Sequence, residues 1–392
     1  MRHLYAYFLG FALLTSCAGE PTSPPDLAIS PPSLATTAGT LPFAQVSAGM
    51  HHTCGLTTGG QVYCWGVNST GQLGDGTTEK HARPTLVAGG LLFRQVSAGQ
   101  NHTCALTTGN RAYCWGRNAS GQLGDGSRTD RFAPVPVAGG RAFRQISAGD
   151  IRTCGLTPST TSKIYCWGSG ILGNGSGSST FSTPQLVSGT RTYRQVAVGG
   201  NHTCAVTTTD KAFCWGRNNW GQLGNGSAAS FTAVKPVAVA GTLQYRQVSA
   251  GRDHTCAVTT SDKAYCWGNG RNGQIGDGKT YLRFTPRAVV GGFSFGRVSA
   301  GVVHTCGKTT SDKAYCWGYN GAGQLGDGTL SPRLTPTAVQ GGLLFKQLDA
   351  GGDHTCGVGS GSLAWCWGSN WWGELGNGTF GAPHPSPSLV QF

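Results

Sequence analysis

Residues 97–126 read SAGQNHTCALTTGNRAYCWGRNASGQLGDG, and this stretch recurs with small changes seven times along the 392-residue chain. Its HTC element begins at His52, His102, Arg152, His202, His254, His304 and His354, so the third copy carries arginine in place of histidine. First cysteines of successive copies are 50 residues apart, except for one interval of 52. A period of about 50 residues is typical of propellers and solenoids, and it suits a four-stranded propeller blade.

Each copy predicts four short strands and no helix. In the second copy they are Phe93–Ala98, His102–Thr107, Arg111–Trp115 and Pro134–Val137, each rich in β-forming residues and bounded by turn residues. A sheet of four short strands cannot bury both faces alone, but sheets stacked around an axis cover one another. We therefore predict an all-β, seven-bladed β-propeller of four-stranded blades over residues 42–392. We expect the ring to be closed by strands from both ends of the chain, which would complete one blade together.

The two cysteines of each copy predict one disulfide per blade. Cys104 and Cys114 are equidistant from Gly109 in the turn between the second and third strands, so a simple hairpin places them directly opposite. A non-hydrogen-bonded antiparallel pair has Cα atoms about 4.5 Å apart, a distance that a disulfide can span. The longer turn of the third copy, residues 158–162, keeps this symmetry. The predicted pairs are Cys54–Cys64, Cys104–Cys114, Cys154–Cys166, Cys204–Cys214, Cys256–Cys266, Cys306–Cys316 and Cys356–Cys366.

Zinc and free thiols are the alternatives to these disulfides. His102 and Cys104 are two residues apart on one strand and share a face, with Cys114 opposite. Structural zinc needs four ligands, and no fourth one recurs. We therefore predict no metal and no cofactor, and we expect the recurring histidine to hydrogen-bond a neighbouring loop. The GDG or GNG element could suggest calcium or phosphate binding, but no further carboxylates stand at ligand spacing, so we expect a turn in which Asp or Asn adopts a left-handed conformation.

The first 17 residues predict an export signal. A short basic start precedes the apolar run Leu4–Leu14, which is too short to span a bilayer. Leu14-Thr15-Ser16-Cys17 resembles the bacterial lipoprotein processing motif, in which the cysteine is lipidated and becomes the new N-terminus. Fifteen cysteines leave Cys17 unpaired after seven bridges. The alternative is an ordinary secretory signal with a spare thiol.

Residues 18–41 are rich in Pro, Ser, Thr and Ala and predict a flexible tether. Together, the two segments predict a protein that is lipid-anchored in the bacterial cell envelope, at the outer membrane. Such an oxidising location favours disulfides over thiols.

The recurring pattern AGxxHTCALT…AYCWGxNxxGQLGDG…PxxV resembles the repeat of the regulator of chromosome condensation family. The resemblance implies a seven-bladed propeller. It does not imply one function, because the family includes nuclear guanine-nucleotide exchange factors, a plant ultraviolet-B receptor and secreted bacterial inhibitors of β-lactamase. Exchange factors of the family use a hairpin wedge, whereas the only extra lengths here are residues 158–162 and two residues between Ala228 and Gln244. The recurring tryptophan of CWG is interpreted as blade core, which disfavours a photoreceptor.

Candidate binding residues occupy the positions that differ from copy to copy. The loop after CWG keeps its Gly and Gln while the residues between them change, and a second variable pair precedes HTC. Trp, Tyr and Arg dominate binding hot spots, and loops on one end of a propeller form a broad surface. The candidate residues are Arg117, Arg217, Trp220, Arg271, Tyr319, Trp371, Trp372, Asp253 and Asp353. The alternative is that they only decorate a solvated rim.

The chain carries a net charge of +13, with basic residues recurring in FRQV and near the hairpin turn. Arg94, Arg144, Arg194, Arg246, Arg297 and Lys346 are assigned to the first of these rings. This positive charge is distributed over all the blades, whereas nucleic-acid-binding proteins concentrate it in one patch or stripe, so we do not predict nucleic-acid binding. No copy contains a carboxylate pair, or a nucleophile with its base, at a recurring position.

We therefore predict a non-enzymatic, surface-tethered scaffold that binds a protein, or else a polysaccharide, and that meets the membrane only through its lipid anchor. A guanine-nucleotide exchange factor or GTPase regulator is the alternative by family resemblance. An enzyme with a site assembled from several blades, such as Asp253 with Asp353 and a ring histidine, is the second alternative.

Overall fold

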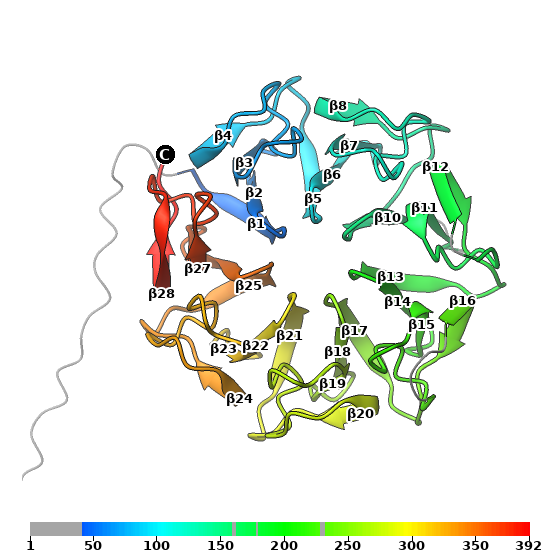
Figure 1. Cartoon of the computed structure of the whole chain (residues 1–392), viewed down its shortest axis with the longest axis vertical. Helices are drawn as coiled ribbons and strands as arrows, with labels where there is room; N and C mark the ends of the chain where they lie inside the picture. Colours follow the sequence, from blue (N-terminus) through cyan, green and yellow to red (C-terminus); the bar gives the residue numbers. More distant parts are fainter. Residues whose placement is uncertain (1–40, 159–161, 178, 228–231) are drawn as a thin grey trace, which may run out of the picture. The chain divides into compact units, whose positions relative to one another are not determined.

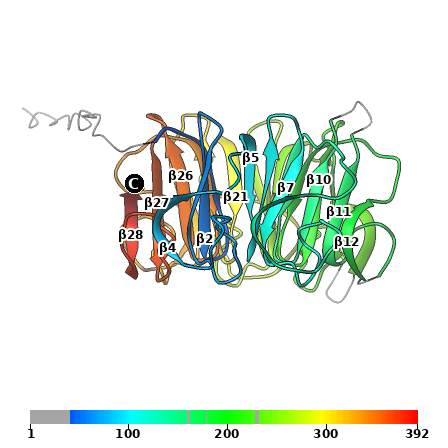
Figure 2. The ribbon, with the colours of Figure 1, turned by 90° about the horizontal axis from the view of Figure 1, so that it is seen from above.

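The computed structural model describes residues 41–158, 162–177, 179–227 and 232–392, which form seven four-stranded antiparallel sheets around a central axis (Figure 1). Figure 2 shows this ring edge-on, with the loops gathered at its two faces. The predicted seven-bladed, four-stranded all-β propeller is confirmed. Over the described ranges, no helix has the length and apolar character needed to cross a membrane. The predicted export signal, Cys17 and the tether up to residue 40 lie outside the described residues.

Each blade is one uninterrupted stretch of chain, and its four strands pair in sequence order. Blade 1 contains β1 (Phe43–Ala48), β2 (His52–Thr57), β3 (Val62–Gly66) and β4 (His81–Leu86). Blade 2 contains β5 (Phe93–Ala98), β6 (His102–Thr107), β7 (Ala112–Gly116) and β8 (Arg131–Pro136). Blade 3 contains β9 (Gln145–Ala148), β10 (Arg152–Leu156), β11 (Ile164–Gly170) and β12 (Ser179–Leu186).

The remaining blades repeat this order. Blade 4 contains β13 (Tyr193–Val198), β14 (His202–Thr207), β15 (Ala212–Arg217) and β16 (Thr232–Ala238). Blade 5 contains β17 (Tyr245–Ala250), β18 (His254–Thr259), β19 (Ala264–Gly268) and β20 (Arg283–Ala288). Blade 6 contains β21 (Phe295–Ala300), β22 (His304–Thr309), β23 (Ala314–Gly318) and β24 (Arg333–Ala338). Blade 7 contains β25 (Phe345–Ala350), β26 (His354–Gly359), β27 (Ala364–Asn370) and β28 (Gly381–Leu389).

The second blade shows how closely the sequence pattern anticipates the strands. β5 and β6 have the predicted bounds, and β7 is shifted by one residue. β8 begins at Arg131, three residues before the predicted Pro134, because a bulge between Cys114 and Gly116 lets the pairing continue to Arg131. Gly116 has φ 101°, a left-handed conformation that glycine adopts without strain.

One disulfide joins the second and third strands of every blade, as predicted. Cys104 and Cys114 are register partners with Cα atoms 4.1 Å apart, the close spacing of a non-hydrogen-bonded pair. The same Cα separation occurs at all seven bridges, including Cys154–Cys166 across its longer turn. The fourteen sulfurs are therefore unavailable as zinc ligands. Across the described ranges, His, Cys, Asp and Glu side chains form no group of three that could hold a metal ion.

The core lies between blades. The tryptophan of each CWG element is fully buried, and Trp115 of blade 2 packs in one cluster with Leu56 and Val62 of blade 1. Its Nε1 donates to the carbonyl of Gln72 in blade 1 at 3.0 Å. Gly74 makes room for this contact, since a Cβ there would lie 2.6 Å from Trp115 Nε1. Neighbouring blades therefore complete one another's cores, which explains why one sheet alone would not be stable.

The expectation that both chain ends complete one blade is wrong. Blade 1 begins with β1 and blade 7 ends with β28, and neither sheet borrows a strand from the other. The ring is closed by side-chain contacts instead. Gln347 Oε1 accepts the Val46 N–H and Gln347 Nε2 donates to the Val46 carbonyl, each at 2.8 Å. Phe392 stacks on Phe43 with ring centroids 5.8 Å apart. The Gln347 contact is the one that joins other neighbouring blades, as Gln195 does with Val248, so a shared sheet is not needed.

Candidate partner-binding face

Both sets of variable loops lie on one face of the ring. In every blade, the backbone N–H that follows CWG donates to the carbonyl of the residue just before the HTC position; examples are Arg117 to Asn101, Arg217 to Asn201 and Tyr319 to Val303, at 2.8–3.1 Å. The β1–β2 and β3–β4 type loops are therefore side by side. We call this surface the variable-loop face. The opposite face carries the hairpin turns between second and third strands and the connections between blades.

Beneath the variable-loop face lies a buried ring of histidines. His102 Nε2 is 2.8 Å from Thr153 Oγ1 in the next blade, and Thr153 Oγ1 donates to the carbonyl of Gln122 at 2.8 Å. Because the threonine has given its proton to that carbonyl, it accepts from the histidine, so Nε2 carries the hydrogen. The expectation that the histidine contacts a neighbouring loop is wrong: its partner is a strand residue, the threonine of the next HTC element.

The ring histidines are held neutral. Burial lowers the pKa of His52, His102, His202, His254, His304 and His354 to about 3 each. Their Nδ1 atoms are buried and have no hydrogen-bond partner among the described residues. A neutral imidazole with one unpaired lone pair is compatible with this environment, whereas a charged one is not. These histidines are structural and do not reach the surface.

Blade 3 departs from this pattern because arginine replaces the histidine. Arg152 is 2% exposed, and its guanidinium donates to the carbonyls of Ile171 and Gly200 at 3.3 and 2.9 Å. Thr203 of blade 4, which a ring histidine would otherwise reach, has no side-chain partner among the described residues. Burial lowers the pKa of Arg152 to about 10, so it stays charged at neutral pH. The blade 3–4 junction thus holds a buried positive charge.

Arg152 belongs to a charged patch that spans blades 3 to 5, which we define as Asp150, Arg152, Arg217, Arg252 and Asp253. Burial raises the pKa of the Asp150 carboxyl, an effect opposed by Arg252 and Arg152. Burial also raises the pKa of Asp253, opposed chiefly by Arg252. Arg217 and Arg252 are exposed. The predicted residues Arg217 and Asp253 therefore share one electrostatic environment.

A stacked pair lies on the same loops of blades 4 and 5. The guanidinium carbon of Arg271 is 4.7 Å from the ring centroid of Trp220, within the range of a cation–π contact. Arg271 is exposed and Trp220 is half-buried. The structure thus brings two more predicted residues together, and the contact holds both side chains in place before any partner arrives.

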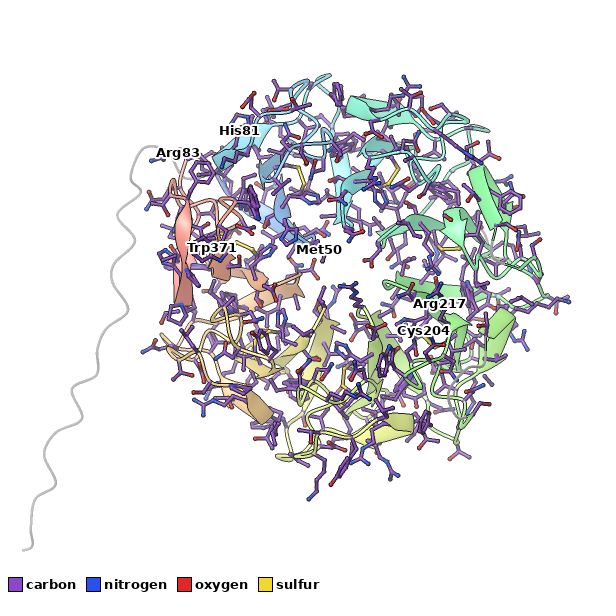
Figure 3. All side chains as sticks on the ribbon, viewed as in Figure 1. Met50, His81, Arg83, Cys204, Arg217 and Trp371 are labelled. Carbon is purple, nitrogen blue, oxygen red and sulfur yellow. A yellow bond between two sulfur atoms is a disulfide. The ribbon has the colours of Figure 1, made fainter. Side chains whose placement is uncertain are left out.

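The tryptophans of blade 7 form a separate aromatic patch, which we define as Trp371, Trp372, Phe380 and Lys80. Trp371 and Trp372 are 60% and 45% exposed, and Phe380 is 48% exposed. Lys80 of blade 1 lies 5.4 Å from the centroid of Trp372 and 4.9 Å from that of Phe380. Figure 3 shows Trp371 and Arg217 on opposite sides of the ring. Trp371 and Arg217 therefore belong to separate patches.

A carboxylate lies beneath the aromatic patch. Glu374 stands where five other blades have glutamine, and its Oε2 accepts the backbone N–H of Trp372 at 2.8 Å, as those glutamines do in their own loops. Its Oε1 lies 3.9 Å from His51 Nδ1. Burial raises the pKa of Glu374, and nearby Asp353 adds to the effect. Glu374 therefore keeps the turn and adds an acidic group that the other blades lack.

The remaining predicted residues are distributed between these environments. Burial raises the pKa of Asp353, with His51 opposing, and Gln324 Nε2 donates to it at 3.2 Å. Arg117 and Tyr319 are exposed on blades 2 and 6, away from both patches. Asp253 and Asp353 have different charged neighbours, so the geometry does not assemble the multi-blade enzyme site from them. The nine candidate residues do not include Lys80, Phe380, Glu374, His51 and Arg252. His51 and Arg252 belong to the variable pair before HTC, and Glu374 is visible in the repeat as a change from GQL to GEL, whereas nothing in the repeat singles out Lys80 or Phe380.

The chain resembles known proteins in sequence as well as in fold. The family model "Regulator of chromosome condensation (RCC1) repeat" matches residues 59–106, 110–156, 162–206, 210–258, 261–307 and 311–358. Among curated relatives, the Protein RCC2 homolog of Danio rerio is 37% identical over 71 residues, which is 18% of this chain and 14% of that protein. The ultraviolet-B receptor UVR8 of Arabidopsis thaliana is 37% identical over 73 residues, 19% of this chain and 17% of the receptor.

Solved structures agree on the fold. Yeast RCC1 (Prp20) bound to Kap60 has a TM-score of 0.76 at 22% identity, covering 88% of this chain and 85% of that one. Human WBSCR16 has a TM-score of 0.72 at 22% identity, covering 80% and 85%. At these identities the likeness shows the architecture alone. The family model, which matches more than half of the residues, shows that the chain belongs to the regulator of chromosome condensation (RCC1) repeat family.

Proposed function

We propose that this propeller is a non-enzymatic scaffold that binds a protein partner through its variable-loop face. The observation that carries the proposal is the contrast between copies: the buried histidines, tryptophans and disulfides repeat from blade to blade, while the exposed aromatic and charged residues on one face differ in each. Exposed tryptophans with no structural task are unusual on a soluble surface and are typical anchors of protein interfaces.

The two patches suggest a partner that covers a large part of this face. The aromatic patch offers apolar area with a lysine at its edge, and the charged patch offers exposed Arg217 and Arg252 beside two carboxyls. A partner reaching both would make apolar contacts over blades 7 and 1 and charged contacts over blades 3 to 5. Because the two patches lie on opposite sides of the ring, a folded protein is a better candidate for the partner than a single peptide strand.

Nucleotide exchange is the alternative, and it is not favoured. A solved structure of Prp20p from Saccharomyces cerevisiae, TM-score 0.75 at 22% identity, is described with its binding properties to Gsp1p and histones. That description supports protein binding as a use of this fold. The lengthened segments that could resemble a wedge are short, and their residues 159–161 and 228–231 lie outside the described residues.

Binding is tested by substitution on each face. Trp371→Ala with Trp372→Ala removes the anchors, and Leu92→Ala with Leu344→Ala is the matched control, because those leucines are 51% and 45% exposed on the opposite face. Each full-length variant is used to co-purify its partner from the native envelope, followed by titration against the identified partner. We expect the tryptophan variant to bind at least about tenfold more weakly with an unchanged melting temperature, since hot-spot residues contribute about 2 kcal/mol or more. If the tryptophan variant bound the partner as tightly as the unmodified protein, or if the leucine control lost binding, the variable-loop face would not be the binding surface.

We further propose that the ring is exported and tethered through a lipidated Cys17 at the surface of the cell envelope. Seven disulfides support an oxidising compartment, and the remaining cysteine lies in the Leu14–Cys17 motif. Intact-mass analysis of the mature protein should find a diacylglyceryl-modified Cys17 at its N-terminus, and Cys17→Ser should release the protein from the membrane fraction. An unmodified Cys17, or membrane retention of the serine variant, would contradict the tether.

A further inference from the structure

One position on the wall of the central channel differs from its six counterparts. Gln45, Gln95, Gln145, Gln195, Gln247 and Gln347 line the channel from the first strand of their blades. In blade 6 this position is Arg297, because Arg297 pairs with Lys308 in the register where Gln195 pairs with Val206. The assignment of Arg297 to the FRQV arginine ring is therefore wrong; Gly296 holds that ring position.

The side chains of the glutamines form hydrogen bonds with the backbone of the next blade, whereas the side chain of Arg297 does not. Gln195 Nε2 donates to the Val248 carbonyl at 2.9 Å, and its Oε1 accepts the Val248 N–H at 2.8 Å. Arginine has no acceptor and cannot make this two-way contact. Arg297 is exposed to solvent, and within the described part of the chain its side chain makes no hydrogen bond or ion pair. A guanidinium with five free donors thus stands in the channel wall.

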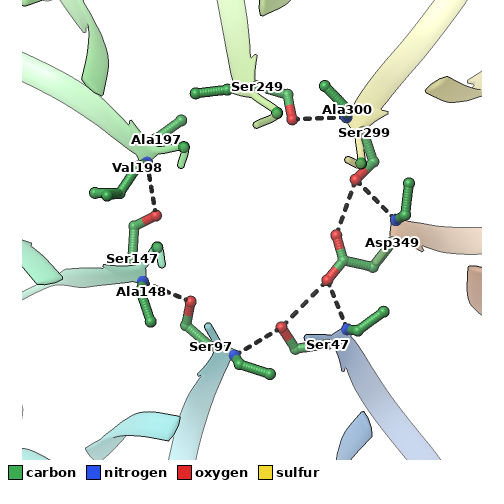
Figure 4. A pocket seen from close by; sticks show the side chains of 18 of the residues that line it. Ser47, Ser97, Ser147, Ala148, Ala197, Val198, Ser249, Ser299, Ala300 and Asp349 are labelled. Atoms are coloured by element: carbon green, nitrogen blue, oxygen red, sulfur yellow. Dashed lines mark hydrogen bonds between the residues drawn. The ribbon is translucent and has the colours of Figure 1, made fainter. Parts of the chain in front are cut away.

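A second ring of polar groups lines the channel two residues further along the first strands, nearer the variable-loop face. In each case a serine hydroxyl accepts a backbone N–H of the neighbouring blade; these residues are Ser47, Ser97, Ser147, Ser249 and Ser299. Figure 4 shows them with Asp349 around the channel. Asp349 accepts from Ser47 Oγ, Ala48 N and Ser299 Oγ. The oxygens of this carboxylate are already occupied by these hydrogen bonds. Arg297 attracts it electrostatically without forming an ion pair.

Around Arg297 the channel mouth on the opposite face widens into a recess of about 460 Å3, lined by Gln145, Arg194, Gln195, Arg246, Gln247, Gly296 and Arg297. None of the described residues that line it is a carboxylate. Arg194 and Arg246 are fixed in place by ion pairs to Asp210 and Asp262, at 2.7 and 2.8 Å, and remain 32% and 34% exposed. Gly296 has no side chain at the position that an arginine occupies in blades 4 and 5. Lys308 pairs with Asp312 in its place, and a Cβ at Gly296 would lie 3.5 Å from Lys308 Cε. Arg297 therefore faces an open, positively charged hollow.

We propose that this recess is a binding site for a small oxyanion-bearing ligand, a polycarboxylate or a phosphate compound, held by Arg297. The planar fork of a guanidinium matches the paired oxygens of carboxylate and phosphate groups, and its charge shortens and strengthens those bonds. Arg194 and Arg246, each paired with an aspartate, line one side of the recess, and the glutamine amides around it are already hydrogen-bonded to neighbouring blades. The site lies on the face away from the partner-binding patches, so it goes beyond the proposed function.

The chain supplies its own conservative variant for the test. Arg297→Gln introduces the residue that the six other blades carry. The variant should fold normally, and the new glutamine should hydrogen-bond the Leu348 backbone as its counterparts do with their own neighbouring blades. The full-length protein is titrated calorimetrically with citrate and, separately, with pyrophosphate at low ionic strength. Arg287→Gln, an exposed arginine on the outer strand β20, is the charge-matched control.

We expect one saturable site for at least one of the two anions, and the pair of titrations shows which oxyanion is preferred. Arg297→Gln should weaken binding at least about tenfold, because a charge-assisted hydrogen bond contributes about 1.5–3 kcal/mol. Arg287→Gln and the double tryptophan variant should bind normally. No saturable binding of either anion, or equal weakening by Arg287→Gln, would overturn the proposal.

Discussion

Reducing all seven disulfides is expected to unfold the propeller. Six bridges join cysteines 10 residues apart and one joins cysteines 12 apart. In the chain-entropy model each such loop contributes about 2.7 kcal/mol to stability, or about 19 kcal/mol for seven. Folded domains keep a net stability of only about 5–15 kcal/mol. The reduced chain should therefore lose its ring at room temperature.

Because the cysteines are fully buried, the reductant must act on opened protein. The measurement is urea unfolding followed by circular dichroism, with and without prior reduction in denaturant. As a graded control, Cys104→Ala with Cys114→Ala removes a single bridge and should cost about 2–3 kcal/mol while leaving the fold intact. A fully reduced protein that refolds and unfolds at the same urea concentration as the oxidised one would show that the bridges do not stabilise the ring.

Acid is expected to unfold the ring well above the usual carboxylate range. Each of the six ring histidines has a pKa of about 3 when folded, against 6.5 in a free chain. A depressed folded pKa gives stability that is present above pH 6.5 and is lost as the pH falls toward 3, since the unfolded chain binds the proton first. At pH 5 the difference amounts to about 2 kcal/mol per histidine.

Five carboxyls act in the opposite sense. Burial raises the pKa of Asp150, Asp253, Asp349, Asp353 and Glu374, so their contribution improves as the pH falls through their folded pKa values. The histidine loss begins at higher pH, near 6.5, and involves more groups, so it dominates between pH 6.5 and 5. Arg152 does not titrate in this window, so the ring position of blade 3 loses no stability between pH 6.5 and 5.

The measurement is the melting temperature from pH 7.5 to pH 4.5. It should fall steeply below pH 6.5, and His254→Asn, which removes one titrating group, should make the free energy of unfolding depend on about one proton fewer. A melting temperature that stays level between pH 7 and pH 5 would contradict the neutral, buried histidine ring.

How far the sequence predicts this molecule depends on the distance over which each contact acts. Cys104 and Cys114 lie symmetrically about their turn, so a hairpin alone sets their register and the disulfides follow. The pairing of His102 with Thr153 depends on how neighbouring blades pack, which no single repeat reveals. The sequence does not show that Arg297 holds the glutamine position, because glycine replaces the basic residue that precedes this position in blades 2 to 5 and 7.

The two patches depend on even longer-range contacts. Lys80 and Trp372 are neighbours only because the first blade meets the last, and nothing local to either residue indicates it. The repeat comparison could identify which residues were free to vary, and therefore that a variable face exists. It could not divide them into an aromatic and a charged patch. Ring closure also escaped prediction, since a shared blade and seven separate blades fit the same order of strands.

The partner-binding role of the variable-loop face is tested most directly by a hydrogen-exchange footprint of the full-length protein with its co-purified partner. Our account predicts slowed exchange in the loops around Trp371 and Trp372 and in those around Arg217 and Arg252, with the hairpin turns of the opposite face unchanged. Protection confined to the hairpin turns or the channel mouth around Arg297 would contradict it.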